Sequence, residues 1–264
     1  MTPDLLVPDW LSRSQQTALM ELVDRNDHAH GDGLLGIVLS GSAGRDYATE
    51  HSDLDVIVVL TDEAASSRTT DRSLDVDEIP ESWSDLRTVV PFGTEAWWMR
   101  WSYAWAPVLL DRTGGALPEA ARRQATLTPD EADAILIDHD RLDGWVNFAY
   151  RALKSDRDGR ALESRPDANE SVPWLLDVVF SISGRVRPYN KYLPWELRTH
   201  PLEGWPADEL LDLVARTQAG DVAAVRETFT RVRAACASYD DQRGHTRTTN
   251  MIDGWGPELG VFVG

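Results

Sequence analysis

The first half of the chain alternates between short apolar runs and polar segments rich in turn residues. Residues 14–25 combine helix formers with a possible cap at Ser14, which predicts a helix. Residues 34–39 and 54–60 are almost continuously apolar, and both runs have the length of a strand. Because neither run alternates regularly with polar residues, both predict strands of a sheet that is covered on its two faces.

Two more strands are expected before residue 120. Residues 73–79 alternate between apolar and polar positions and end at Pro80, which places Asp75 and Asp77 together on one face of a third strand. Residues 108–111 are a short apolar run that ends in an aspartate before a glycine-containing turn. Asp111 is expected to cap that turn, because a carboxylate at this position can accept hydrogen bonds from the backbone of the turn.

A stripe of tryptophans lies between the last two predicted strands. Trp97, Trp101 and Trp105 recur every four residues behind a possible helix start at Thr94, and Pro107 follows them. An aromatic stripe with helical spacing is typical of a helix face that packs into a core. Stacking of these rings on a sugar or a base is the less favoured alternative.

From Thr128 onward the hydrophobic period becomes helical. Thr128 is followed by Pro129 at the first helical position and by an acid at Glu131, a combination typical of a capped helix start. Apolar residues then fall on one helix face at Ile135, Leu142, Val146, Ala149 and Leu153. Residues 171–183 and a segment that begins at Asp221 predict two further helices. The pattern therefore predicts an α+β chain, with a small mixed β-sheet domain over residues 1–120 and an all-helical domain over residues 121–264.

Composition adds limits to this picture. The 264 residues carry a formal net charge of −18, which argues against binding of long nucleic acids and is compatible with a cationic substrate. General solubility is an equally good explanation of that charge. The chain contains no apolar run long enough to span a membrane and shows no signal-peptide pattern at its N-terminus. With a single cysteine, Cys236, an internal disulfide is excluded, and the expected location is the cytoplasm.

The segment Gly41 to Asp55, GSAGRDYATEHSDLD, carries the candidate chemistry. Gly41 and Ser42 follow directly on a predicted strand, where glycine permits close approach of a ligand and successive backbone N–H groups can bind an anion. A short helix from Ala43 and the Ser42 hydroxyl would add further donors to such a site. Together these features favour a turn that binds phosphate.

Asp53 and Asp55 flank Leu54 at the start of the second predicted strand. The period of two sends both carboxylates to one face and Leu54 into the core. Hard oxygen ligands fixed side by side on a strand are suited to Mg²⁺. An isolated Asp-x-Asp is usually only a solvated strand end, but the preceding Gly-Ser turn and the two apolar strands favour a metal site here.

This arrangement resembles the nucleotidyltransferases of the DNA polymerase β superfamily, and within it the aminoglycoside and lincosamide nucleotidyltransferases. The resemblance rests on Gly41-Ser42 and Asp53-Leu54-Asp55, their spacing, and the two strands that flank them. It implies that the two aspartates hold Mg²⁺ and that the Gly-Ser turn holds the triphosphate of a nucleotide. It also implies that a helical domain follows the small sheet domain.

Further residues enter through the same resemblance. Leu74-Asp75 matches the place of the third carboxylate of the family, which makes Asp75 the first choice for the general base and Asp77 the second choice and a candidate metal ligand. Lys191, one of only two lysines, matches a lysine that reaches the nucleotide phosphates from the second domain. Arg45 either contacts phosphate or holds the loop in place, and the sequence favours neither.

The resemblance implies an enzyme that transfers a nucleoside monophosphate, AMP from ATP, to a hydroxyl of a small molecule and releases pyrophosphate. The charge of −18 favours a cationic acceptor such as an aminoglycoside. Asp138, Asp140 and Asp143 are candidates for pairing with its amines, although a solvated helix face is favoured for at least two of them. The alternatives are a protein-nucleotidylating, antitoxin-like enzyme and a non-catalytic nucleotide-binding regulator on the same fold.

Overall fold

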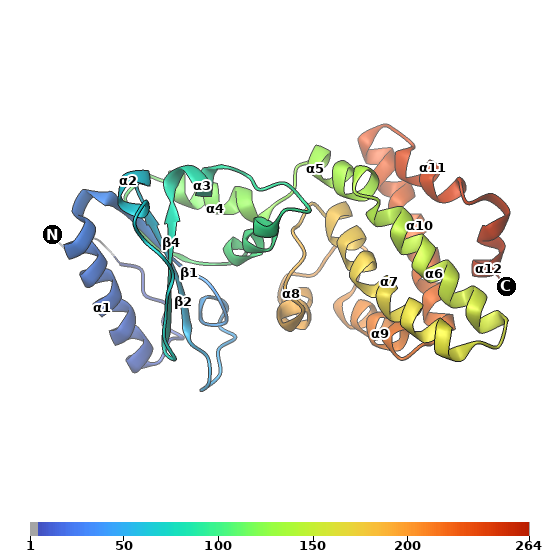
Figure 1. Ribbon diagram of the computed structural model, residues 1–264, viewed down its shortest axis with the longest axis horizontal. Helices are drawn as coiled ribbons and strands as arrows, with labels where there is room; N and C mark the ends of the chain where they lie inside the picture. Colours follow the sequence, from blue (N-terminus) through green and yellow to red (C-terminus); the bar gives the residue numbers. More distant parts are fainter. Residues whose placement is uncertain (1–4, 264) are drawn as a thin grey trace. The chain divides into compact units, whose positions relative to one another are not determined.

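The computed structural model describes residues 5–263, and its architecture is α+β, as predicted. The chain divides into two compact units, one ending at Thr126 and the other beginning at Leu127 (Figure 1). The strands of the described residues all lie in the first unit, whereas the second unit consists of helices and the turns between them.

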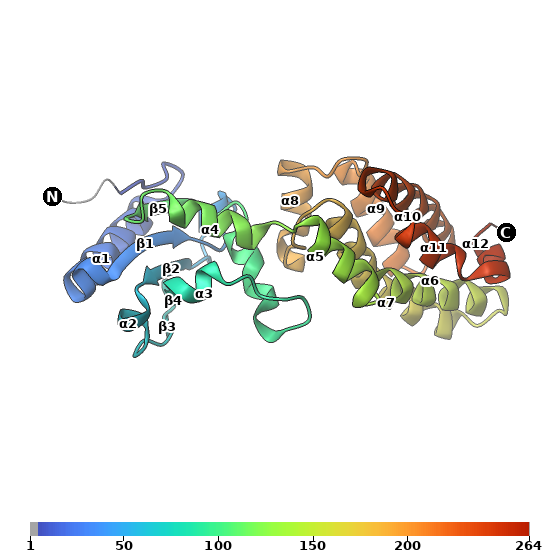
Figure 2. The ribbon, with the colours of Figure 1, turned by 90° about the horizontal axis from the view of Figure 1, so that it is seen from above.

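The first unit is built on one mixed sheet. Its strands are β1 (Leu34–Leu39), β2 (Leu54–Leu60), β3 (Asp71–Arg72), β4 (Val76–Ser82) and β5 (Val108–Asp111). Their order across the sheet is β3-β4-β2-β1-β5, with β2 and β4 parallel and the other neighbours antiparallel (Figure 2). As a result, the end of β1 and the starts of β2, β4 and β5 all lie at one edge of the sheet, the edge that is formed by strand ends and not by an outer strand.

Helices cover both faces of this sheet, as the apolar strands predict. The helices and helical turns of the unit are α1 (Arg13–His30), η1 (Gly31–Gly33), η2 (Ala43–Arg45), α2 (Asp62–Ala65), α3 (Trp83–Arg87), η3 (Glu95–Tyr103) and α4 (Ala116–Ala125). Leu54, Val56 and Val58 of β2 belong to the core shared with α1, whereas Ile57 and Val59 pack with residues of α3 and α4. Alternate residues of β2 are therefore buried in two separate cores.

Two predicted boundaries in this unit are corrected. Helix α1 is capped by Ser12 and not by Ser14, because the Ser12 hydroxyl accepts from the backbone N–H of Gln15 and the Gln15 side chain accepts in return from Ser12. Strand β4 begins at Val76 and runs through Pro80. Pro80 is tolerated there because β3 pairs only with Asp77 and Glu78 of β4, which leaves β4 an edge strand at the proline.

The tryptophan stripe forms a 3₁₀-helix, η3, and not the predicted α-helix. Trp97 and Trp101 are buried, in line with the core interpretation. Trp105 lies beyond the helix, is 45% exposed and has a backbone φ of 61°. The change of helix type breaks the four-residue spacing, so the three rings do not share one face.

The second unit has a single large apolar core made by its long helices. Its elements are α5 (Pro129–Asp133), the π-helical turn η4 (Ala134–Asp138), α6 (Arg141–Arg157), α7 (Ala161–Ile182), η5 (Asn190–Tyr192), α8 (Leu193–Thr199), α9 (Ala207–Gln218), α10 (Val222–Arg243), α11 (Arg247–Asp253), η6 (Gly256–Leu259) and α12 (Gly260–Val263). The predicted capping box at Thr128 and Glu131 is present. The helical stretch that starts there is interrupted before Arg141, where Asp140 adopts a φ of 54°, yet every predicted core position of that stretch is buried.

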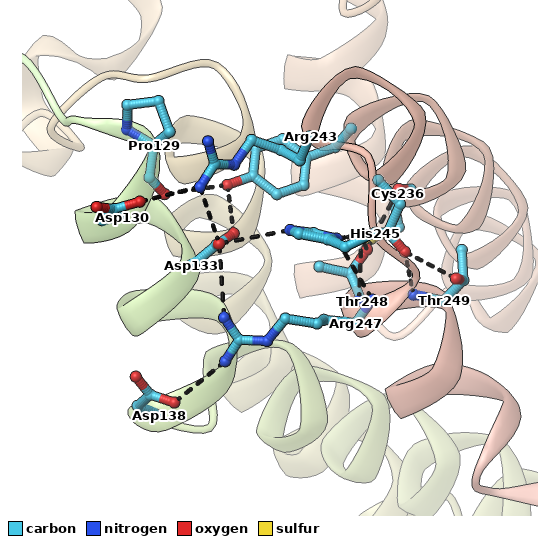
Figure 3. A network of polar contacts seen from close by, with 12 residues as sticks. Pro129, Asp130, Asp133, Asp138, Cys236, Arg243, His245, Arg247, Thr248 and Thr249 are labelled. Carbon is cyan, nitrogen blue, oxygen red and sulfur yellow. Dashed lines mark hydrogen bonds and ion pairs between the residues drawn. The ribbon is translucent and has the colours of Figure 1, made fainter.

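A polar network joins α5 to the end of α10 and the start of α11 (Figure 3). The Asp133 carboxylate accepts from the Tyr239 hydroxyl at 2.7 Å and from the Arg243 guanidinium at 3.2 Å. Asp240 accepts from the backbone N–H and hydroxyl groups of both Thr248 and Thr249. These bonds offset the cost of burying two carboxylates beside the apolar core of the unit.

This network predicts that the second unit loses stability in acid. Burial acts to raise the pKa of Asp133, but the hydrogen bonds from Tyr239 and Arg243 outweigh it and lower that pKa below its ordinary value. The bonds from Thr248 and Thr249 lower the pKa of Asp240 in the same way. A lowered pKa stabilises the fold above the unfolded-state pKa of about 4, and this stabilisation is lost as the pH falls through the folded-state pKa.

Urea unfolding followed by circular dichroism across the acid range tests this expectation. Asp133→Asn should lower the free energy of unfolding at neutral pH by about 1–2 kcal/mol, and the difference from wild type should shrink as the pH drops below about 4. Asp212→Asn is the matched control, because the Asp212–Arg216 pair lies on the exposed face of α9 and is expected to contribute little. Equal pH profiles for wild type and Asp133→Asn would contradict the prediction.

Candidate active site

Three carboxylates gather at the sheet edge where β2 and β4 begin. One oxygen from each of Asp53, Asp55 and Asp77 lies within 4.8 Å of the others, and all three residues are half-buried. Asp55 and Asp77 are direct partners in the parallel register of β2 and β4. Asp53 immediately precedes β2, two positions before Asp55. Among the residues 5–263, these three thus form a group that could hold a metal ion.

The alternation of the strands explains why these carboxylates share a face. Leu54 and Val56 of β2 enter the core on the α1 side, so Asp55 between them points to the other face. Val76 packs on the α1 side as well, and the following Asp77 therefore lies on the same face as Asp55. Leu54 and Val56 are fully buried and Val76 is partly buried, so the strands that carry the carboxylates are fixed by the core.

The Gly-Ser turn after β1 lies directly against Asp55. The Ser40 N–H donates to the carbonyl oxygen of Asp55 at 2.8 Å, which ties the start of the turn to β2. Gly41 has a φ of 58°, in the left-handed region that favours glycine. A Cβ atom on Gly41 would lie 1.8 Å from Oδ2 of Asp55, so the absence of a side chain lets the turn and the carboxylate meet.

Ser42 lies at the start of η2 and is 9% exposed. Its carbonyl oxygen accepts from the backbone N–H groups of Arg45 at 3.2 Å and Tyr47 at 3.0 Å, which closes the turn. The short helix predicted from Ala43 is present as this single 3₁₀ turn. Gly41 and Ser42 are therefore brought to the edge of the sheet that holds the three aspartates.

Arg45 is buried beneath this turn, with 4% of its surface exposed. Its guanidinium donates to the Gly41 carbonyl at 2.7 Å and to the carbonyls of Ser102 and Ala104 at 3.1 and 2.6 Å. The guanidinium carbon also lies 4.1 Å from the ring centroid of Trp101. Of the two interpretations offered by the sequence, this geometry is that of a residue that holds the loop in place.

Asp75 is not a member of the carboxylate group. It precedes β4 in a bend that follows Ser73, is exposed, and lines a cavity on the α1 side of the sheet together with Leu11 and Leu54. The prediction that a strand carries Asp75 and Asp77 on one face is wrong at Asp75, because β4 starts at Val76. The geometry therefore favours Asp77 as the third carboxylate.

The remaining sequence candidates lie in the second unit. Lys191 is on η5, with its ammonium nitrogen 4.7 Å from the ring centroid of Tyr192. Asp138 pairs with Arg247 at 3.5 Å (Figure 3), and Asp143 accepts from the indole N–H of Trp255 at 2.9 Å. Asp140 is the N-cap residue of α6. Asp138 and Asp143 thus have partners within the unit, and a role for Lys191 stays a prediction.

Asp111 caps the turn after β5, as expected from the sequence. Its carboxylate accepts from the backbone N–H groups of Thr113 at 2.8 Å and Gly115 at 2.7 Å. Burial acts to raise the pKa of Asp111, but the hydrogen bonds from Thr113 and Gly115 outweigh it and lower that pKa.

Two acidic residues of β4 were not singled out by the sequence. Glu78 is 4% exposed and pairs with Arg25 and Arg68 on the α1 side. On the opposite face, burial and the nearby charge of Asp85 raise the pKa of Glu81 to about 7, against a hydrogen bond from Tyr103 that lowers it. The alternation of side chains along the strand after Asp77 could have identified Glu81, because it places Glu81 on the same face as the carboxylate group.

No protein-family model matches the chain, and the comparison with curated proteins found no match. Among solved structures, it is similar to the crystal structure of a nucleotidyltransferase-like protein from Exiguobacterium sibiricum 255-15, with a TM-score of 0.39 and 12% sequence identity. The similarity covers 86% of this chain and 77% of the other. None of the helices formed by residues 5–263 is both long and apolar enough to cross a membrane.

Proposed function

We propose that this protein is a magnesium-dependent nucleotidyltransferase that moves AMP from ATP to a hydroxyl of a small cationic molecule and releases pyrophosphate. The observation that carries the proposal is the contact between two features at one sheet edge. The Gly41-Ser42 turn, which we propose binds phosphate, packs against Asp55, and Asp55 lies within the group formed with Asp53 and Asp77. Binding of phosphate and of metal beside each other is the minimum that phosphoryl chemistry requires.

The donor set fits Mg²⁺. Three carboxylates offer hard oxygen ligands, and in octahedral Mg²⁺ geometry adjacent ligand oxygens lie about 3 Å apart and opposite ones about 4 Å. The three oxygens lie within 4.8 Å of one another, so rotations of the side chains that bring them closer would let them share one ion. Bound Mg²⁺ would polarise the α-phosphate and neutralise charge that develops on the pyrophosphate leaving group.

The protein's own residues account for the rest of the reaction. The backbone N–H groups and the hydroxyl at Gly41-Ser42 would hold the terminal phosphates, and Lys191 is proposed to add a positive charge to the same phosphates. Asp77 would accept the proton of the acceptor hydroxyl while the oxygen of that hydroxyl forms a bond to the α-phosphorus. The bond between the α-phosphorus and the bridging oxygen then breaks, and pyrophosphate leaves.

The net charge supports a cationic acceptor. At −18, the chain would attract an aminoglycoside-like polycation and repel a long nucleic acid. A neutral hydroxyl compound would not gain from this field. An aminoglycoside is therefore the acceptor class that we propose first.

Transfer of label from ATP tests the proposal. The full chain is incubated with Mg²⁺ and ATP labelled at either the α- or the γ-phosphate, together with a panel of aminoglycosides and a neutral lincosamide. The α-label should move to the acceptor and the γ-label should appear in pyrophosphate, and neither should occur in the presence of a chelator. The mass of the product identifies the modified molecule.

The same experiment separates the rivals. Transfer of the α-label to a protein in a cell extract, with none to a small molecule, would favour the protein-nucleotidylating alternative. Nucleotide binding with no pyrophosphate release, tested with each of the four nucleoside triphosphates and every acceptor, would favour the regulatory alternative and contradict the proposed activity.

A further inference from the structure

We propose that Arg45 is a positioning residue, which sets the distance between the Gly-Ser turn and the Asp55 carboxylate without itself touching the nucleotide. The catalytic part of this inference rests on the proposed function. Its structural part, that Arg45 fixes the turn, does not.

The first argument is the way the guanidinium is used. Arg45 donates from Nη1 to the Gly41 carbonyl and from Nη2 to the carbonyls of Trp101, Ser102 and Ala104. With 4% of the residue exposed and its guanidinium carbon 4.1 Å from the ring centroid of Trp101, both edges and a face of the group contact protein. Both Nη groups of Arg45 are therefore already engaged by protein carbonyls, which favours a positioning role.

The second argument is what the acceptors have in common. Trp101, Ser102 and Ala104 belong to the segment at the end of η3, which leads to β5, whereas Gly41 belongs to the turn after β1. The same segment receives a bond from the Ser40 hydroxyl at 2.7 Å to the Ser102 carbonyl. Arg45 therefore fastens the turn to a neighbouring segment that is itself anchored in the core through Trp101, which is 1% exposed.

The third argument links Arg45 to the metal ligands. The carbonyl that accepts at 2.7 Å belongs to Gly41, and an added Cβ on Gly41 would lie 1.8 Å from Oδ2 of Asp55. A shift of Gly41 would therefore open or close the space in which this carboxylate sits. Removal of a group that orients a metal ligand without binding the metal itself commonly weakens metal binding by about 10–100-fold.

A second buried arginine supplies a matched control. Arg100 is 1% exposed, lies over the ring of Trp97 at 4.6 Å, and donates to the carbonyls of Gln124 and Thr126. It matches Arg45 in burial, ring contact and type of acceptor, but none of these acceptors lies in the Gly-Ser turn. Any effect of general destabilisation should therefore appear in variants of both residues.

The experiment compares Arg45→Lys and Arg45→Met with Arg100→Lys and Arg100→Met. Binding of Mn²⁺ in the absence of nucleotide is measured by electron paramagnetic resonance, since an all-oxygen site accepts Mn²⁺ in place of Mg²⁺. Amide hydrogen exchange reports on residues 41–45. Lysine keeps the charge but not the fork of donors, so both Arg45 variants should bind Mn²⁺ about tenfold more weakly and exchange faster in the turn. Both Arg100 variants should match wild type in the two measurements.

Should Arg45→Met fail to fold, Arg45→Lys keeps the test open, because it preserves most of the volume and the charge. Wild-type Mn²⁺ affinity and turn exchange in Arg45→Lys, with a raised KM for ATP alone, would overturn the inference and assign Arg45 a direct phosphate contact. Equal losses in the Arg45 and Arg100 variants would overturn it as well. A wild-type protein that binds no Mn²⁺ would instead contradict the proposed function, while hydrogen exchange still decides whether Arg45 fixes the turn.

Discussion

Asp55→Asn is expected to lower the rate of nucleotide transfer by about a thousandfold, equivalent to about 4 kcal/mol of transition-state stabilisation. Asp55 is the central member of the carboxylate group, because it pairs directly with Asp77, follows Asp53 by two positions and contacts Gly41. Asparagine keeps the shape of the side chain but removes its negative charge. A loss of this size should appear in kcat under single-turnover conditions with saturating ATP.

The same substitution should not unfold the protein. Three carboxylates within 4.8 Å repel one another in the absence of a cation, so removal of one charge relieves repulsion. In a chelator, Asp55→Asn is therefore expected to melt at the temperature of wild type or above it. Addition of Mg²⁺ should raise the melting temperature of wild type and leave that of the variant unchanged, because a ligand stabilises only the fold that binds it.

Asp75→Asn is the matched control for this substitution. Asp75 lies near the same sheet edge but outside the carboxylate group, so its variant should retain activity within about threefold of wild type, a difference of less than 1 kcal/mol. Asp77→Asn should behave like Asp55→Asn. Full activity in Asp55→Asn, or an equal loss in Asp75→Asn and Asp77→Asn, would show that the metal ligands have been wrongly assigned.

The strands around the site were predictable because each is a self-contained apolar run. Residues 34–39, 54–60 and 108–111 are strands with the predicted bounds, since turn-forming residues delimit each run. The side-chain period of two then places Asp53 and Asp55 on one face without any knowledge of the partner strands. Local pattern is sufficient wherever the residues that define the site belong to a single strand.

The third carboxylate could not be predicted in this way. Residues 73–79 alternate over their whole length, but pairing with β2 starts only at Val76, which is the partner of Leu54. The start of β4 is therefore set by a neighbour about 20 residues away in the sequence and not by the residues themselves. A shift of this kind separates Asp75 from Asp77, although both follow the same local pattern.

The contacts of Arg45 could not be predicted from the sequence either. Its acceptors include the backbone carbonyls of Trp101, Ser102 and Ala104. Every residue type has such a carbonyl, so the sequence does not reveal which ones accept hydrogen bonds from an arginine. An arginine three residues after a Gly-Ser turn is compatible with a phosphate ligand and with a buried anchor. Only the fold of η3 against the turn distinguishes the two.

Gly41→Ala is expected to abolish most of the transfer activity, by about a hundredfold or more, while the fold persists. Two separate costs fall on this position. A left-handed φ of 58° costs an alanine about 1 kcal/mol relative to glycine. The new methyl group would also lie 1.8 Å from Oδ2 of Asp55, far inside any van der Waals contact.

The second cost is relieved most easily at the catalytic group. The two closest atoms, Oδ2 at 1.8 Å and Cγ at 2.7 Å, belong to a flexible side chain, so rotation of Asp55 away from Gly41 relieves most of the clash, although its Cβ stays close at 3.0 Å. That rotation would move its carboxylate away from Asp53 and Asp77, and the metal site would be distorted. We therefore expect a large loss in kcat and in Mn²⁺ affinity, together with a decrease of about 1–3 kcal/mol in the free energy of unfolding.

Gly114→Ala separates the two costs. Gly114 has a φ of 69°, similar to that of Gly41, but an added Cβ would meet nothing within 4 Å. It should therefore show the backbone cost alone, a decrease of about 1 kcal/mol in stability with unchanged kcat and Mn²⁺ affinity. Backbone strain is common to both variants, and only the contact with Asp55 differs between them. If Gly41→Ala lost no more activity than Gly114→Ala, the close approach of the turn to Asp55 would therefore have no part in catalysis.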